Sequence, residues 1–314
     1  NVTTILLAVP MTLVVCKQLN VSPVPFILSQ VFASNIGGAA TLVGDPPNII
    51  IASRANLSFN DFLVHMAPWV IVVMMVITPM LVFMFRKELV NTAADRARID
   101  KLDEKSYLKD KVLLKKSLFV LGAVMIAFVL HTALHLEPSI VAMLGAGVLV
   151  GISRLKPKDY AMDVEWATLV FFAGLFIMVG ALVKTGALGE FAKFLKDQVG
   201  DQASLAAMVL LFVSAILSGI IDNIPYVASM SPVVTELSAG ISNQYGDVLW
   251  WALAFGADFG GNATIIGASA NVVAIGLAHK AGIKISFWQF AKYGIPVTLV
   301  SVAMVAPYIL IRYF

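Results

Sequence analysis

The sequence predicts an all-α, polytopic membrane protein with two inverted repeats, each containing a re-entrant helical hairpin and a broken transmembrane helix. Hydrophobic residues make up 59% of the 314 residues and charged residues only 13%, whereas a soluble domain carries about a quarter charged residues. Two motifs also occur twice in the same order: NVTTILLAVP is followed by GGAATLVGDPPN, and NIPYVASMSP is followed by GGNATIIGASAN. Polar, helix-breaking stretches repeated within apolar sequence are typical of secondary transporters with two related halves.

The two halves keep their register over each motif. Asn1 aligns with Asn223 and Pro10 with Pro232 without a gap. In the second motif the matching positions are the glycine pairs Gly37–Gly38 and Gly260–Gly261, then Thr41 and Thr264, Gly44 and Gly267, and Asn48 and Asn271. A third match, SFNDFLVHMAP against SFWQFAKYGIP, follows each.

Apolar runs long enough to cross a bilayer core of roughly 30 Å occur at 62–85, 117–134, 166–183, 203–221 and 287–311. The segment 86–116 contains ten of the 22 Lys and Arg residues, so the positive-inside rule predicts that it is cytoplasmic. From that loop, 138–152 is expected to return to the inside. Residues 187–198 are expected to form a short amphipathic helix near the outer surface.

The second half is interrupted at two places. Within 203–238 the sequence breaks at Asp222, and Pro225 removes an amide donor there. Each arm is short for a full crossing at about 1.5 Å per residue, so we expect a re-entrant hairpin. Residues 243–281 are expected to form a helix broken at 260–271.

The first half is expected to repeat this plan with the opposite orientation. Residues 1–19 would be the second arm of a matching hairpin, and 22–55 a broken helix. Because the chain opens without Met in an apolar segment, we expect an upstream part of this half to precede it. The expected units are 1–61 and 186–285 for transport, 62–185 for scaffold helices, and 286–314 for a last scaffold helix.

Irregular backbone at membrane depth must be buried in protein or line a wet cavity. The breaks are therefore expected to converge, with helix N-termini facing an anion and C-termini facing a cation. Glycines allow a positive φ and close backbone approach, while asparagine and threonine supply oxygens and donors. The alternative is that these residues only cap broken helices. The candidate ion- and solute-binding residues are Asn1, Thr3, Gly37, Gly38, Thr41, Asp45, Asn48, Asp222, Asn223, Asp258, Gly260, Gly261, Asn262, Thr264 and Asn271.

Three acids lie in or beside the breaks, where a carboxylate is costly unless it is paired, hydrated or functional. Asp222, at the hairpin tip, is the favoured coupling site, either ligating Na⁺ or carrying a proton. Asp45 could equally cap the following half-helix, since Asp is a preferred N-cap before Pro. Asp258 is favoured for an ion or proton role. The expected Na⁺ ligands are Asn1, Asn48, Asp222, Asn223 and Asn271.

Other residues favour simpler interpretations. His131 and His135 could bind a metal, but an outer-boundary pair is favoured. The single Cys16 excludes a disulfide framework and a cysteine metal site. No cofactor is expected beyond Na⁺ or H⁺ as a coupling ion, and the net charge of +3 follows membrane topology rather than nucleic-acid binding.

The motifs resemble the ion transporter superfamily, in the branch of arsenite permeases, NhaD-type sodium/proton antiporters and the pigmentation P protein. The segments that carry the resemblance are NVTTILLAVP, SNIGGAATLVGDPPNI, VEWATLVFFAGLFIMVGAL, DNIPYVASMSPV and GGNATIIGASANVV. The resemblance implies a homodimer in which a transport unit moves against a scaffold in an elevator-like way. Related dicarboxylate symporters have Ser and Thr where this chain has Asp222 and Ile224, which puts dicarboxylate binding in doubt.

The sequence therefore predicts a secondary active transporter, coupled to H⁺ or Na⁺, in a prokaryotic cytoplasmic membrane. Arsenite or antimonite efflux and Na⁺/H⁺ antiport are the leading activities. The alternatives are a coupled citrate or dicarboxylate transporter and a passive ion channel. An enzyme is not expected, because no nucleophile–base motif is present. The expected partners are a small ionic solute, the lipid bilayer and a second copy of the chain.

Overall fold

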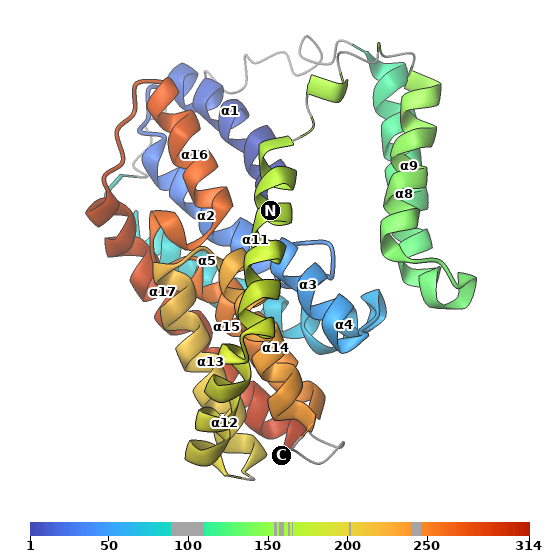
Figure 1. Ribbon diagram of the computed structural model, residues 1–314. Helices are drawn as coiled ribbons and strands as arrows, with labels where there is room; N and C mark the ends of the chain where they lie inside the picture. Colours follow the sequence, from blue (N-terminus) through green and yellow to red (C-terminus); the bar gives the residue numbers. More distant parts are fainter. Residues whose placement is uncertain are drawn as a thin grey trace.

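The all-helical fold is confirmed in the part of the chain that a computed structural model describes. The described residues are 1–88, 110–153, 156, 160–162, 164, 166–200, 202–239 and 246–314, and they contain helices and connections without strands. Figure 1 shows the helices in their order along the chain. Most of the predicted cytoplasmic loop 86–116 lies outside the described residues.

The first half begins with one long helix followed by a broken one, as the sequence predicts. Its helices are α1 (Val2–Leu19), α2 (Val24–Gly38), α3 (Pro46–Ala55), α4 (Phe59–His65) and α5 (Ala67–Met84). The helix α1 ends at Asn20, which adopts the left-handed conformation with a φ of 55°. The break between α2 and α3 coincides with the predicted one.

The apolar run at 62–85 is not a single helix, because the structure divides this segment at Met66. The helix α4 begins with a capping box, in which Ser58 and Asp61 each satisfy the other's backbone amide. Pro68 occupies the first turn of α5, where its missing N–H has no intrahelical acceptor to lose. Hydropathy alone does not detect this division because both helices are apolar.

The middle of the chain forms a helical pair that stands to one side of the other helices (Figure 1). The pair consists of α8 (Lys111–Leu134) and α9 (Pro138–Ser153), which pack against each other. It contacts the rest of the molecule at α4, where the amide Nδ2 of Asn60 donates to the Val129 carbonyl at 2.9 Å. Next come α11 (Trp166–Lys184) and α12 (Ala187–Val199), which are bent by 67° at their junction.

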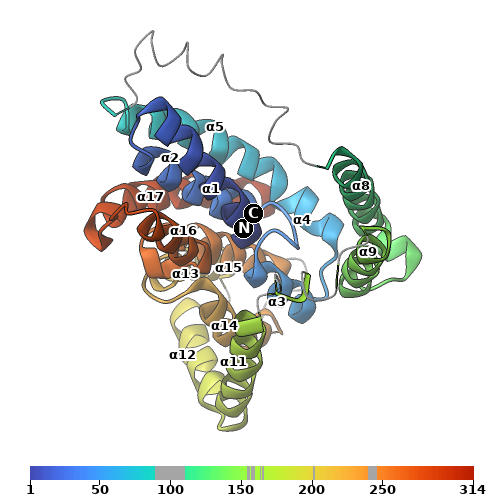
Figure 2. The same ribbon diagram turned by 90° about the horizontal axis from the view of Figure 1, so that it is seen from above.

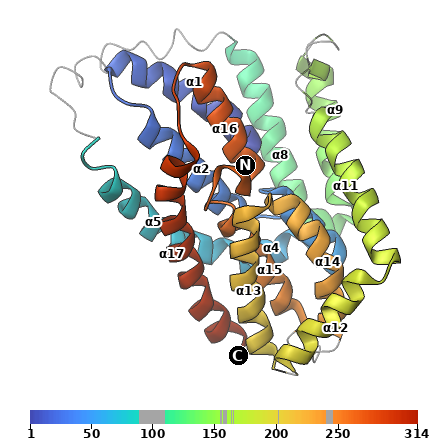
Figure 3. The ribbon, with the colours of Figure 1, turned by 60° about the vertical axis from the view of Figure 1, so that its left-hand side comes forward.

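The second half contains a hairpin and a second broken helix. Its elements are α13 (Ala203–Ile220), α14 (Asn223–Ala239), α15 (Gly246–Gly260), the 3₁₀ turn η1 (Ile265–Gly267), α16 (Ser269–Lys280) and α17 (Phe287–Tyr313). The helices α13 and α14 meet at Ile221–Asp222 and form the two arms of the predicted hairpin (Figure 3). The predicted second break between α15 and α16 is confirmed.

Each half packs its own hairpin arm against the broken helix of the other half. The helix α1 lies along α16, and α14 lies against α3, as Figures 1 and 2 show. At the centre, α15 is buried from Val248 to Gly260 and packs against α13, α14, α17 and α3. This exchange brings the two breaks together, although the inversion of the halves across a membrane stays a prediction.

The outer faces are apolar and exposed, as lipid contact requires. Trp288 is 78% exposed and Ile311 84% exposed. Among the described residues, five helices are long and apolar enough to cross a membrane, namely α1, α5, α8, α13 and α17. The bent pair of α11 and α12 adds a sixth candidate if it is one span.

Candidate functional site

The two breaks have the same internal hydrogen bonds. In the first, the amide Nδ2 of Asn48 donates to the carbonyl oxygens of Gly38 at 3.3 Å and Thr41 at 3.1 Å. In the second, Asn271 makes the matching pair of bonds at 2.7 and 2.8 Å. Each asparagine therefore replaces the helical hydrogen bonds that the break removes, so the irregular backbone has the partners that membrane burial demands.

The glycines of the breaks serve close packing and not an unusual backbone conformation. A Cβ on Gly44 would overlap the carbonyl oxygen of Gly38, and one on Gly267 would lie 2.7 Å from that of Gly261. The paired glycines do not use the positive φ that glycine allows, because the described glycines with a positive φ are Gly186, Gly200 and Gly282. Gly37 has open space around it.

A network of asparagine side chains joins the two halves. The fully buried Asn35 of α2 donates to the side-chain oxygens of Asn262 at 3.0 Å and Asn271 at 2.8 Å. Its own oxygen accepts from Nδ2 of Asn1 at 3.2 Å. Both donors of the Asn35 amide, and its oxygen, are therefore engaged, and the network ties α1 and α2 to the second break.

Asp45 lies between the N-termini of the two hairpin arms. Its Oδ2 accepts from Nδ2 of Asn1 at 2.5 Å and from Nδ2 of Asn223 at 3.4 Å. Although Asp45 occupies the N-cap position of α3, its side chain makes no capping bond to the described backbone. The geometry does not show the helix cap, and the alternative role of Asp45 as an ion ligand stays a prediction.

Asp222 has the arrangement of a helix cap. Its Oδ1 accepts from the backbone N–H of Ile224 at 3.0 Å, at the first turn of α14. Its Oδ2 accepts from the hydroxyl of Ser269 at 2.8 Å, which ties the hairpin tip to the start of α16. Both oxygens of the favoured coupling acid are thus hydrogen-bonded within the protein.

Asp258 is the acid without partners. Its side chain is fully buried near the C-terminal end of α15. Among the described residues neither of its oxygens has a hydrogen-bond partner, and the same holds for Oδ1 of Asn48 and Nδ2 of Asn262. Almost all buried polar groups in native proteins are hydrogen-bonded, so these unpaired atoms are the candidates for contact with a ligand.

The structure sorts the predicted site residues into three groups. The side chains gathered at the centre are those of Asn1, Asp45, Asn48, Asn223, Asp258, Asn262 and Asn271. Those around it are Gly38, Thr41, Asp222, Gly260, Gly261 and Thr264. Thr3 and Gly37 are exposed, outside the cluster. The Na⁺ ligands expected from the sequence stay a prediction.

Sequence reasoning missed Asn35, although a signal was present. The register that aligns Gly37 with Gly260 also places Asn35 opposite Asp258, each two residues before its glycine pair. Asn35 lies before the glycine-rich segment and has no acid next to it, so the criteria for site residues did not select it. Equivalent positions in the two halves therefore carry an amide and a carboxylate.

The cluster contains three acidic side chains, those of Asp45, Asp222 and Asp258. Asp45 is near enough to both Asp222 and Asp258 for the carboxylates to act on each other electrostatically. Within the described residues, no Lys or Arg side chain acts on any of these three acids. Such a site attracts a cation and repels an uncompensated anion.

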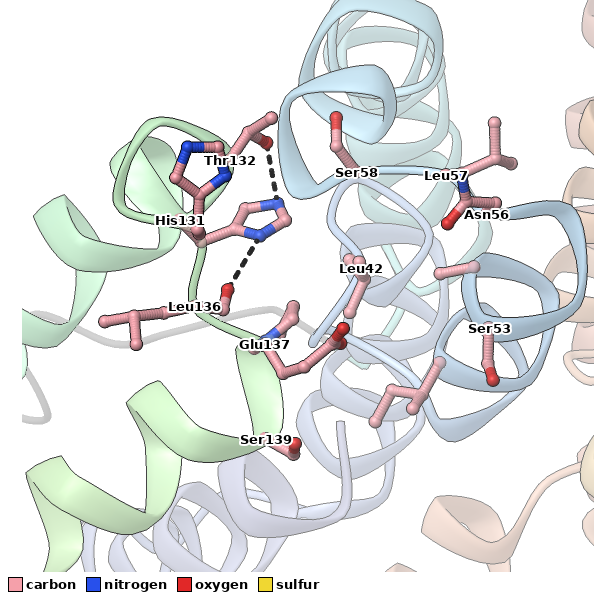
Figure 4. Close-up of a pocket in the computed structure, with 14 residues that line it drawn as sticks. Leu42, Ser53, Asn56, Leu57, Ser58, His131, Thr132, Leu136, Glu137 and Ser139 are labelled. Carbon is pink, nitrogen blue, oxygen red and sulfur yellow. Dashed lines mark hydrogen bonds between the residues drawn. The ribbon is translucent and has the colours of Figure 1, made fainter.

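A separate cavity of about 720 Å³ lies between α3 and the turn that joins α8 to α9 (Figure 4). His131, which lines it, accepts from the backbone N–H of Phe59 through Nε2, and its Nδ1 lies 3.2 Å from the Leu136 carbonyl. Because a carbonyl only accepts, Nδ1 must donate, and both ring nitrogens are engaged. The histidine therefore has a structural role and leaves no nitrogen for a metal.

Comparisons with known proteins agree with this picture. An uncharacterized transporter of Mycobacterium tuberculosis is 54% identical over 316 residues, covering all of this chain and 73% of the relative. A 46 kDa membrane protein of Mycobacterium leprae is 52% identical over 314 residues, with the same coverage of 100% and 73%. The human P protein is 33% identical over 394 residues and is covered over 47% of its length, which confirms the resemblance to its branch.

Residues 1–256 match the CitMHS family, described as a citrate transporter. The apolar helices and the bacterial relatives named membrane proteins agree with a multi-pass protein of the inner membrane. The chain belongs to the CitMHS family of membrane transporters.

Proposed function

We propose that this CitMHS-family transporter is a secondary active transporter that uses a cation gradient, of H⁺ or Na⁺, to move a small ionic solute. The observation that carries the proposal is the acidic cluster at the meeting point of the two breaks. A passive pore has no need of buried, unpaired carboxylates, which cost several kcal/mol at membrane depth unless they are functional. A cation that binds there and is released on the other side compensates that cost transiently.

Na⁺/H⁺ antiport is the activity that the charge of the site supports best. Both ions are monovalent cations, and Asp45 and Asp258 are buried acids on which no Lys or Arg side chain of the described residues acts. Arsenite or antimonite efflux is the other leading activity. Neutral arsenite carries hydroxyls, which asparagine amides can bind as donors and acceptors.

Citrate is the second candidate, favoured by the family description. The unpaired Nδ2 of Asn262 offers one donor to a carboxylate oxygen. A citrate trianion beside three acids would be repelled, so it would have to enter together with protons or metal cations. Citrate transport is therefore expected to require a cation in the same compartment.

Reconstitution into liposomes tests the proposal. We expect one of Na⁺, citrate and arsenite to accumulate against its own gradient when a pH or Na⁺ gradient is imposed, and to stop when an ionophore collapses that gradient. Asp45→Asn should lower gradient-driven accumulation. Asp197→Asn, on the exposed face of α12, is the matched control and should leave it unchanged.

Two results would contradict the proposal. Flux that only runs downhill would indicate a channel, because a channel cannot concentrate its solute. Accumulation that is indifferent to both imposed gradients would exclude H⁺ and Na⁺ as coupling ions. The elevator-like movement and the homodimer belong to the same proposal, and they rest on the resemblance to the superfamily.

A further inference from the structure

The two halves differ chemically at one pair of equivalent positions. Asn35 and Asp258 each precede a glycine pair by two residues, and each lies next to the asparagine that closes the break of the other half. Asn35 contacts Asn271, and Asp258 lies beside Asn48. An amide and a carboxylate have nearly the same shape. The two positions therefore differ in charge and in whether the side chain has a hydrogen to donate.

On the Asn35 side the network is complete. The Asn35 amide donates to the oxygen of Asn271 at 2.8 Å, while the amide of Asn271 donates to the backbone of its own break. Every polar atom of the Asn35–Asn271 pair thus has a partner, and the pair carries no charge. Nothing further is required at this position.

On the Asp258 side the hydrogen-bond network is incomplete. The amide hydrogens of Asn48 also go to the backbone of its own break, which leaves its Oδ1 as an acceptor. A carboxylate in place of the amide has no hydrogen to donate. Both oxygens of Asp258 and Oδ1 of Asn48 are consequently without a partner among the described residues, although both side chains are fully buried.

We propose that Asp258 and Asn48 hold one monovalent cation, and that the amide of Asn35 occupies the equivalent place in the other half, so that this pair of positions binds one cation per chain. The inference rests on the proposed function, because the bound cation is taken to be its coupling ion. The cation is either a proton on Asp258 or a Na⁺ ion ligated by the two oxygens of Asp258 and Oδ1 of Asn48.

The surrounding charges favour a single cation. Among the described residues, the charged side chain that acts on Asp258 is that of Asp45, at the start of α3. No titratable side chain of the described parts of α2, α13, α14 or α17 acts on it. Asp45 accepts from two amide donors, and its carboxylate form strengthens the field that attracts a cation to Asp258.

The test uses the purified full chain in detergent and measures melting temperature against Na⁺ concentration, with choline as the replacement ion, and against pH. The wild type should be stabilised by Na⁺ or by acidification. Asp258→Asn should remove that dependence and melt at least as high as the cation-free wild type, since the new amide donates to Asn48 as Asn35 does to Asn271.

The reciprocal variants make the test specific. Asn35→Asp should make the melting temperature depend on a second cation, because the new carboxylate no longer donates to Asn271 as the amide of Asn35 does. The exchange variant Asn35→Asp/Asp258→Asn should restore a dependence on a single cation. If Asn35→Asp does not fold, Asp258→Asn and infrared detection of a protonated carboxylic acid still decide the question.

The outcomes distinguish Na⁺ from a proton as the bound cation, and the cation site from the proposed function. A Na⁺-dependent shift that Asp258→Asn abolishes assigns the site to Na⁺. A carboxylic acid band and pH-dependent shift abolished by the same change assign it to a proton. A wild type that responds to neither, or an Asp258→Asn protein that responds like the wild type, overturns the inference. Failure of gradient-driven accumulation with the cation-dependent shift intact would overturn only the proposed function.

Discussion

Asparagine, at the scale of single residues, supplies most of the polar chemistry at the centre of this protein. Asn1, Asn35, Asn262 and Asn271 form one connected network. An amide donates and accepts without carrying a charge, so its burial at membrane depth costs far less than burial of an ion once its bonds are made. The network can therefore hold the two halves together and leave the acids to bind a cation.

The first prediction concerns the residue at the centre of this network. Asn35→Ala should lower the free energy of unfolding by roughly 2–4 kcal/mol, because it leaves several buried polar atoms without partners at 1–3 kcal/mol each. Thermal unfolding in detergent measures it. Asn60→Ala, which removes one exposed hydrogen bond to α8, is the control and should cost less than about 1 kcal/mol. Equal losses would contradict a central role for Asn35.

The second prediction separates charge from capping at Asp222. Asp222→Ala should cost about 1 kcal/mol, the usual loss of an N-cap, and Asp222→Asn only a few tenths because asparagine also caps well. Unfolding of the two variants in detergent measures both values. Loss of cation-dependent stabilisation in Asp222→Asn, with its stability retained, would instead support the coupling role expected from the sequence.

Sequence reasoning located the acids of the cluster but could not divide their roles. Asp45 precedes Pro46 and fits a helix cap or an ion ligand equally, whereas Asp222 stands at a hairpin tip and is expected to ligate Na⁺ or carry a proton. In the structure Asp222 caps α14 and Asp45 bridges Asn1 and Asn223. Local sequence cannot decide this, because the competing donors come from the other half of the chain.

At the scale of the elements, the two broken helices are held by contacts that leave no room for a side chain. Backbone passes backbone at Gly38–Gly44 and at Gly261–Gly267. Small residues therefore define the shape of each break, and the asparagine bonds across it define its rigidity. The second break is held in addition by Asn35 of α2 and by the carbonyl of Gly219 of α13, which accepts from Thr264.

The third prediction follows from the packing at these glycines. Gly44→Ala should lower the free energy of unfolding by about 1–3 kcal/mol, the range for overpacking, because its Cβ would overlap the Gly38 carbonyl. Gly37→Ala lies in the same break with open space around it and should be neutral or slightly stabilising. Melting temperatures in detergent compare the pair, and a Gly37→Ala loss as large as that of Gly44→Ala would contradict the assignment.

Helices and breaks were predictable because hydropathy, glycine pairs and proline act locally. The ends of α2, α3, α15 and α16 follow the repeated motif closely. The division at Met66 was not predictable from hydropathy, since apolar residues continue on both sides of it. Its signals are the capping pair at Ser58 and the proline at 68.

At the scale of the whole molecule, the pair α8–α9 is the part least attached to the rest. The cavity between α3 and the α8–α9 turn (Figure 4) separates a segment assigned by sequence to the transport unit from one assigned to the scaffold. Under the elevator-like movement that we propose, surfaces across this cavity slide past each other. Helices within one unit keep their contacts.

The fourth prediction tests that movement with thiol cross-links in a Cys16→Ser background. A flexible bifunctional reagent joining Ser53→Cys to Ser139→Cys, which both line the cavity, should arrest transport. Joining Thr12→Cys to Gln30→Cys should spare it, because these residues are hydrogen-bonded at 2.5 Å within the first unit. Flux before and after reductive cleavage of each cross-link measures the effect. The reverse pattern would point to local gating.

The packing of α1 on α16 and of α14 on α3 also has a consequence for how the protein is made. A ribosome delivers α1 long before α16, so the first half enters the bilayer without the surface that it will finally contact. Non-local partners of this kind delay folding, and the two halves must stay apart in the lipid until synthesis is nearly finished. Assembly is therefore a late step, in which each half supplies the packing surface that the other half lacks.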